Sequence, residues 1–133
     1  MAITAHLVVD GAVKAVEFYK AALGAEEVRR APAEDGQRLM HAELAVDGGK
    51  LFLCDDFPEY CGGKIRAASK LGTTPVTLHL EVPDCDAAIA RAEAAGATVT
   101  MPAADMFWGD RYGRIVDPFG HEWSFSTPVK KAA

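Results

Sequence analysis

The chain has 133 residues, of which half are apolar and a quarter are charged, and its net charge is −5. This length and composition suit one domain with one hydrophobic core. The acidic balance argues against electrostatic binding to nucleic acid or to an anionic membrane surface. No apolar run approaches the roughly 20 residues that span a bilayer. There is no secretory signal pattern, and the three cysteines lack C-x-x-C spacing, so we expect a cytoplasmic protein.

The first part of the chain predicts a strand, a helix and three further strands. Apolar residues recur at helical spacing after Asp10, and the helix should end at Gly24, because glycine readily adopts the left-handed conformation of a helix end. Asp10 is expected to cap this helix with its side chain. Residues rich in β-branched and apolar types predict the strands Ile3–Val9, a short one near Glu27–Arg30, Arg38–Val46 and Leu51–Cys54.

A polar, glycine-bearing stretch, Asp55–Pro75, follows without clear periodicity. It is too long for a tight turn, so we expect a connector that runs over one face of the protein. Two carboxylates, Asp55 and Asp56, stand at its start. We expect them to belong to a solvated loop rather than to a catalytic pair.

The residues after the connector repeat the first pattern in the same order. His79-Leu80-Glu81-Val82 echoes His6-Leu7-Val8-Val9, and each stretch begins two residues after a threonine. Asp84 is expected to cap a second helix that ends at Gly96. The strands expected in this copy are Val76–Val82, Thr98–Met101, Arg111–Val116 and Glu122–Ser126.

An internal repeat of this kind predicts an α+β fold of two βαβββ modules, with paired curved sheets around a cleft and the helices outside. Module 1 is expected at about 3–54, the connector at 55–75, module 2 at about 76–127 and a short polar tail at 128–133. The alternative is an ordinary α+β sandwich that has no working cleft.

Three motifs carry a resemblance to a known superfamily. They are EFYKAALGA (17–25), MFWGDRYGR (106–114) and DPFGHEW (117–123). Over residues 3–127 the chain resembles the vicinal oxygen chelate superfamily of glyoxalases, bleomycin resistance proteins and extradiol dioxygenases, and within it the PhnB-like branch. The resemblance implies a cupped site that a homodimer often completes, and in many members that site holds a divalent metal.

The ligand pattern of that superfamily is not met here. It calls for three or four histidine or glutamate side chains. The resemblance instead places poor ligands at those positions, namely Thr4, Leu53, Thr77 and Ser124. We therefore expect no metal cofactor. The alternative is a shifted site of His6, His79 and Glu122, which lie two residues from those positions and so should face the same side of their strands.

Aromatic residues near the C-terminal end are the best candidates for binding a ligand. Phe107, Trp108 and Tyr112 can form the wall of a pocket, and Arg111 can bind a carboxylate or phosphate. The alternative is that Arg111 and Asp110 form a contact network that packs the loop onto the sheet. We expect the D-P-F-G turn to shape a hairpin without a chemical role. His41 and Glu43 are expected to be ordinary strand residues, and His121 a surface or hinge residue.

Two functions remain open at this point. The favoured one is a small-molecule-binding protein of the glyoxalase and bleomycin resistance type, without the usual metal site and paired as a homodimer. The other is an enzyme of the same superfamily. It would be a metal-dependent lyase or dioxygenase, or a metal-free acid–base catalyst that uses His79 or Glu122. The sequence does not name the ligand, because one fold hosts many functions.

Overall fold

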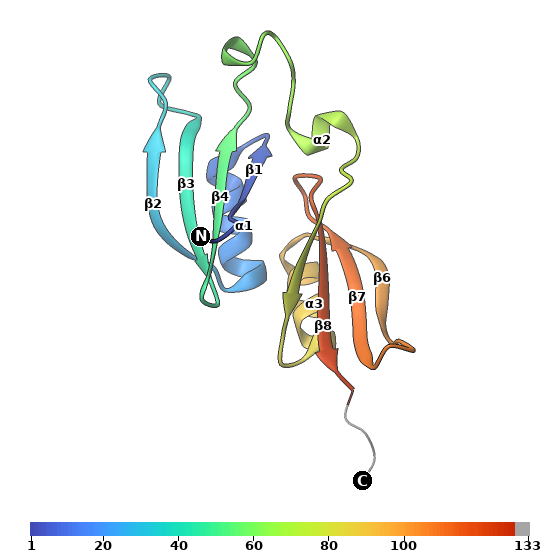
Figure 1. Cartoon of the computed structure of the whole chain (residues 1–133). Coiled ribbons are helices and arrows are strands. Elements are labelled where there is room, and N and C mark those ends of the chain that lie inside the picture. Colours follow the sequence, from blue (N-terminus) through green and yellow to red (C-terminus); the bar gives the residue numbers. More distant parts are fainter. Residues whose placement is uncertain (130–133) are drawn as a thin grey trace.

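The computed structural model describes residues 1–129, which form two four-stranded sheets, each covered by one helix (Figure 1). The first module comprises β1 (Ala5–Val9), α1 (Ala12–Leu23), β2 (Glu26–Pro32), β3 (Leu39–Val46) and β4 (Gly49–Asp55). The second comprises β5 (Thr77–Glu81), α3 (Cys85–Ala95), β6 (Thr98–Asp105), β7 (Asp110–Val116) and β8 (Glu122–Pro128). The connector holds a 3-10 turn, η1 (Pro58–Tyr60), and α2 (Ala68–Leu71). Residues 130–133 of the expected polar tail lie outside the described residues.

Both sheets have the same topology. Their strand orders are β1-β4-β3-β2 and β5-β8-β7-β6, and in each the first strand runs parallel to the last while the other neighbours are antiparallel. This repeat confirms the predicted α+β class with two βαβββ modules. No helix in the described residues is long and apolar enough to span a bilayer.

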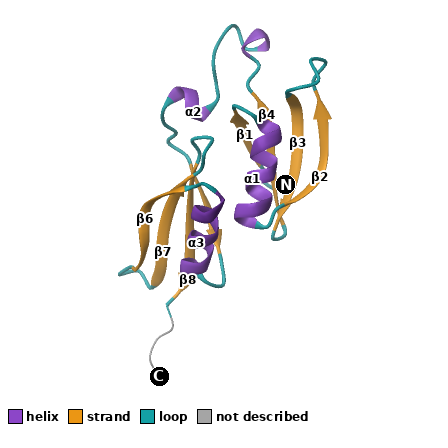
Figure 2. Ribbon diagram, turned by 180° about the vertical axis from the view of Figure 1, so that it is seen from behind, coloured by secondary structure: helices purple, strands orange, loops and turns teal. Residues whose placement is uncertain are grey.

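One face of each sheet is buried under its helix and the other is open. Strand residues alternate between the faces, so Leu7 and Val9 of β1 lie in the core with Leu51 and Leu53 of β4. The helices α1 and α3 pack against each other. Figure 2 shows both helices on the same side of the molecule, so the open faces of the two sheets look to the opposite side.

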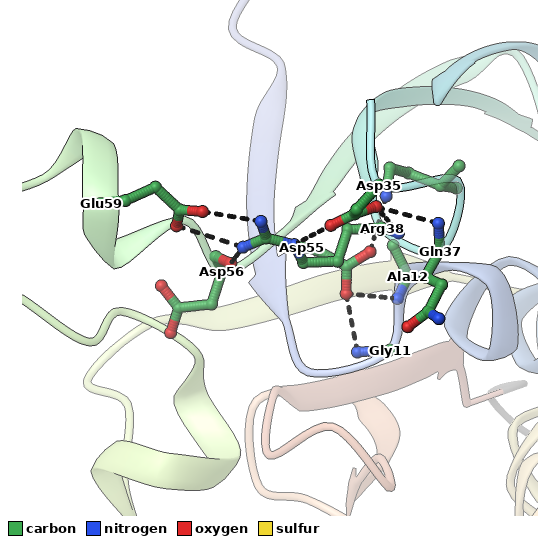
Figure 3. A network of polar contacts seen from close by, with 9 residues as sticks. Gly11, Ala12, Asp35, Gln37, Arg38, Asp55, Asp56 and Glu59 are labelled. Carbon is green, nitrogen blue, oxygen red and sulfur yellow. Dashed lines mark hydrogen bonds and ion pairs between the residues drawn. The ribbon is translucent and has the colours of Figure 1, made fainter. Parts of the chain in front are cut away.

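The start of α1 is held by Asp55 rather than by Asp10, so the predicted cap is wrong (Figure 3). Asp55 is buried at the end of β4, and one of its carboxylate oxygens accepts the N–H groups of Gly11 and Ala12, both at 2.9 Å. Its other oxygen accepts Leu39 N–H at 2.8 Å. Gly11 takes the cap position with a φ of 104°, and this leaves Asp10 one residue too early to cap the helix.

The connector is folded by its own polar contacts and is joined to the first module through Arg38. Asp56 is buried and accepts the N–H groups of Arg66 and Ala67, each at 2.9 Å. Arg38 donates to the Asp56 carbonyl at 3.1 Å and to the Glu59 carboxylate at 2.6 Å (Figure 3). The expectation of a solvated acidic loop is therefore wrong. Asp55 and Asp56 are both buried, and their carboxylates accept backbone N–H groups from distant parts of the sequence.

The D-P-F-G turn joins the two modules. Asp117 is 4% exposed, and its carboxylate accepts hydrogen bonds from four donors. The Tyr19 hydroxyl of α1 donates at 2.5 Å, the Trp123 indole and Phe119 N–H at 2.8 Å, and His121 N–H at 3.0 Å. Burial and the adjacent Asp117 charge raise the pKa of Tyr19 well above its ordinary value. The turn shapes its hairpin, as expected, and also connects α1 to the second sheet.

The helix α2 packs on the same turn. Gly120 has a φ of +85°, and a Cβ there would lie 2.6 Å from the backbone nitrogen of Ser69. Only glycine allows α2 to approach this closely. His121 is half-buried, and its Nε2 lies 3.0 Å from the carbonyl oxygen of Val8, so it too bridges the modules.

Candidate functional site

The open face of the second sheet carries a continuous set of polar and aromatic side chains. Alternate residues of β5, β7 and β8 point to this side, and the strand register brings them together. His79 lies opposite Ser124, and Tyr112 lies opposite Ser126. The members of this set are Thr77, His79, Tyr112, Arg114, Glu122, Ser124 and Ser126.

His79 is held between two serines. Its Nδ1 lies 2.7 Å from Ser124 Oγ, and its Nε2 lies 3.0 Å from Ser126 Oγ. In a neutral imidazole one nitrogen donates and the other accepts, so one hydroxyl donates to the ring and the other accepts from it. Both serines are buried. A nucleophile must reach its substrate, so these hydroxyls position the ring rather than act as nucleophiles.

Four rings form what we call the aromatic row: Phe107, Trp108, Tyr112 and His79. Neighbouring ring centroids lie 5.0, 5.8 and 6.1 Å apart in that order. These distances are those of interacting aromatic pairs. Phe107 is 98% exposed and Trp108 is 52% exposed, so the outer half of the row is open to solvent. The structure thus brings together three of the residues expected to bind a ligand and joins them to His79.

Arg114 is the cation beside this row. Its Nε donates to the Tyr112 hydroxyl at 3.0 Å, and its guanidinium carbon lies 5.7 Å from the centre of that ring. The Glu122 carboxylate lies 3.5 Å from the guanidinium and accepts the Thr77 hydroxyl at 2.5 Å. The face therefore offers a cation and a carboxylate in one polar group and an imidazole in another, and the rings of Tyr112 and His79 bring the two groups together.

Arg111 lies on the opposite, helix-covered side of the sheet. Its guanidinium donates to the Asp86 carboxylate of α3 at 2.6 and 3.0 Å and to Asp105 at 3.0 Å. These partners differ from the Asp110 contact considered above. Arg111 is next to Tyr112 in β7 and therefore points to the opposite face. Arg114 lies two residues after Tyr112 and therefore shares the face of Tyr112. The alternation of side chains along β7 is the sequence signal that could have identified Arg114.

The side chains considered for a shifted metal site do not converge. Both nitrogens of His79 are engaged by serines, and Glu122 is engaged as described above. His6 lies on the other sheet, with its ring 5.8 Å from His41 and 6.0 Å from Phe52. No three histidine, cysteine, aspartate or glutamate side chains within residues 1–129 form a group that could hold a metal ion. The donor set of the described chain does not fit a metal.

One position assigned through the resemblance is shifted by one residue. Leu53 is fully buried in the core and cannot face the cleft. The register pairs His6 with Phe52 and His79 with Ser124, so Phe52 is the counterpart of Ser124. The first sheet therefore presents an aromatic ring where the second presents a hydroxyl.

On the open face of the first sheet, His6 is flanked by rings, whereas His79 on the second sheet is flanked by hydroxyl groups. The rings of His41 and Phe52 lie 4.8 Å apart, and both contact His6. Partial burial, the neighbouring His41 and the charge of Arg66 lower the pKa of His6. Glu43 is also buried, and its carboxylate lies 3.5 Å from the Arg29 guanidinium.

Comparison with known proteins identifies the family. A family model described as the Glyoxalase/Bleomycin resistance protein/Dioxygenase superfamily matches residues 3–125. The chain belongs to this superfamily. An uncharacterized protein of Mycobacterium tuberculosis is 50% identical over 130 residues, which cover 98% of this chain and 76% of that protein. The X-ray structure of a gene product from Arabidopsis thaliana has a TM-score of 0.74 at 30% identity and covers 95% of this chain and 98% of its own.

The PhnB-like branch is represented among the structural neighbours. A Bacillus cereus protein described as a PhnB protein and putative 3-demethylubiquinone-9 3-methyltransferase has a TM-score of 0.71. It is 18% identical and covers 96% of this chain and 99% of its own. At 18% identity the likeness shows a shared fold alone, so it says nothing about the activity of the present chain.

Proposed function

We propose that this chain is a small-molecule-binding protein and that its ligand lies along the aromatic row on the open face of the second sheet. The observation that carries the proposal is the exposure of Trp108 and Phe107 next to Tyr112, Arg114 and His79, whose side chains are each held by polar contacts. Aromatic rings together with a few fixed polar groups are the usual composition of a ligand site. Membership of the superfamily agrees with this function without naming the ligand.

The chemistry of the face favours a compact aromatic ligand that carries an acceptor group. A planar ring can stack on Trp108 or Tyr112. The guanidinium of Arg114 can receive a carboxylate or phenolate, because its ion pair with Glu122, at 3.5 Å, is longer than a charge-assisted hydrogen bond. His79 adds a ring whose orientation the two serines fix.

We propose that binding needs no metal ion. The support is that His79 and Glu122 are engaged by protein groups while His6 lies on the other sheet. Elemental analysis of protein purified without a chelating tag checks this. We expect less than one tenth of an equivalent of zinc, nickel, manganese or iron. One equivalent that is lost in His79→Ala would contradict the proposal and favour the metal-dependent enzyme.

We also propose that two copies of the chain pair so that their open faces enclose the ligand site between them. The support is that both open faces look to the same side (Figure 1), and that the exposed Phe107 and Trp108 border one of them. Contiguous exposed apolar groups of this kind mark interaction sites. Light scattering should give the mass of a dimer at tens of micromolar, an order of magnitude suited to a stable pair. A monomer at that concentration would contradict pairing.

We propose the cytoplasm as the place of action, because Cys54, Cys61 and Cys85 are all free thiols. A fusion to a fluorescent protein in its native host tests this through the distribution of the signal. Recovery of the protein in the culture medium or in an oxidising compartment would contradict it.

Tryptophan fluorescence tests the ligand site directly. Trp108 is half-exposed whereas Trp123 is 4% exposed, so a ligand on the aromatic row should change the emission of Trp108 alone. We expect some small aromatic carboxylates or phenols to quench wild type and not Trp108→Phe. Arg114→Gln should weaken the response, and Arg111→Gln, on the other face, should leave it unchanged. No response from any compound, or a response that survives Trp108→Phe, would refute this site.

A further inference from the structure

A groove of about 790 Å³ lies between the two modules, away from Trp108 and Arg114. Its walls are the C-terminal end of α1, the β3–β4 turn, β5 and the first turns of α3. A volume of this size falls within the usual range for small-molecule sites. The apolar part of its lining includes Leu23, Val46, Leu80 and Phe125. His79 is the one member of the aromatic row that also lines this groove.

The charged groups of this groove are mostly acidic. Asp47, Glu81 and Asp84 line it, and Arg91 is the cation among the lining residues. The Arg91 Nε is already engaged, because it donates to the carbonyl oxygen of Ala21 at 2.8 Å. Asp84 serves partly as the cap of α3. The ion pairs found within residues 1–129 involve neither Asp47 nor Glu81.

We propose that this groove binds an organic monocation, an ammonium group attached to an apolar body. The apolar body lies against Leu23 and Leu80, where it loses contact with water, and the ammonium group lies among the carboxylates of Asp47 and Glu81. Three carboxylates and one guanidinium leave a net negative charge along the groove, which raises the local concentration of cations and discourages anions. This site adjoins the proposed aromatic row only at His79, and either site can fail without the other.

Three probes of similar size and different charge test the proposal: phenethylammonium, 2-phenylethanol and phenylacetate. Each is titrated into ¹⁵N-labelled full-length protein at about 0.1 M salt, which limits the non-specific attraction of distant charges. Phenethylammonium should bind most tightly and shift the amide signals of Gly24, Gly49 and Ala88, which line the groove. Phenylacetate should leave these signals in place, and any shift that it causes at Tyr112 concerns the other site.

Two neutralising variants locate the cation. Glu81→Gln and Asp47→Asn should each weaken phenethylammonium binding about two- to fivefold, the range of an exposed ion pair. Asparagine suits position 47, where the φ is 49°, because it tolerates the left-handed conformation. Glu34→Gln is the matched control, since it removes the same charge from an exposed position outside the groove. Equal binding of all three probes, no shift from phenethylammonium, or an equal loss in Glu34→Gln would overturn the proposal.

Discussion

Replacing Asp117 with asparagine should destabilise the protein by about 3–6 kcal/mol, because it removes two hydrogen bonds to a buried charge, each worth about 1.5–3 kcal/mol. One oxygen of Asp117 accepts from Tyr19 and Trp123, and the other accepts from two backbone N–H groups. Asparagine keeps one oxygen and turns an NH₂ group toward two donors. The loss is a large part of the roughly 5–15 kcal/mol that stabilises a domain.

Tyr19→Phe isolates one of these bonds. It should cost about 1.5–3 kcal/mol, since Trp123 still donates to the same oxygen of Asp117. The variant that combines Tyr19→Phe with Asp117→Asn should lose less unfolding free energy than the sum of the two single losses, because both changes affect one hydrogen bond. Urea unfolding followed by far-ultraviolet circular dichroism measures all three.

Asp105→Asn is the matched control for this series. Asp105 is exposed and pairs with Arg111, so its loss should cost less than about 1 kcal/mol. An Asp117→Asn variant that is destabilised no more than this control would refute the reasoning.

The burial of Tyr19 beside the charge of Asp117 predicts the response to alkaline pH. The folded chain raises the pKa of Tyr19, so above pH ~10 a tyrosine of the unfolded chain releases its proton while Tyr19 in the folded chain retains it. Unfolding becomes more favourable as the pH rises, so stability is complete below pH ~10 and falls above it. Tyr19→Phe should lose less stability than wild type between pH 9 and 10.5. An equal loss in both would contradict the shift.

Two further predictions concern the connector and the first sheet. Gly120→Ala should cost at least about 1–3 kcal/mol of unfolding free energy, because it forces alanine into a positive φ and a Cβ against Ser69; thermal unfolding with no change in midpoint would contradict this. His6 should titrate below its ordinary value of 6.5, so the stability that it contributes is lost as the pH falls below 6.5. His41→Ala should raise the pKa of His6 in an NMR titration, and a fall would show that the cause is wrong.

The sequence predicted the modules well because their strands and helices follow local patterns. The alternation in β1 and the helical spacing in α1 depend on neighbouring residues, and the repeat doubled the signal. The four-residue helix α2 was not expected, since so short an element has no periodicity to detect.

Polar groups that meet across long sequence separations could not be predicted in this way. Asp55 caps a helix that begins 43 residues before it, and Asp117 accepts from Tyr19, 98 residues away. Nothing local in the sequence predicts these distant partners of the two carboxylates. In the candidate site, Phe107, Trp108 and Tyr112 were identified because aromatic clustering is visible in the sequence. Alternation along the strand already puts Arg111 and Tyr112 on opposite faces, and the register of β7 shows that the face of Tyr112 is the one that carries His79.

The most direct test of the proposed function observes the two tryptophan indole N–H signals separately by NMR while small aromatic acids and phenols are added. Trp123 donates its indole N–H to the buried Asp117 of the D-P-F-G turn, whereas Trp108 lies in the exposed half of the aromatic row. A ligand on that row should shift the Trp108 indole signal and the amide signals of Tyr112 and Arg114, and leave the Trp123 indole in place. If no compound shifts the Trp108 signal, or if binding shifts Trp123 instead, the ligand does not lie on the open face of the second sheet.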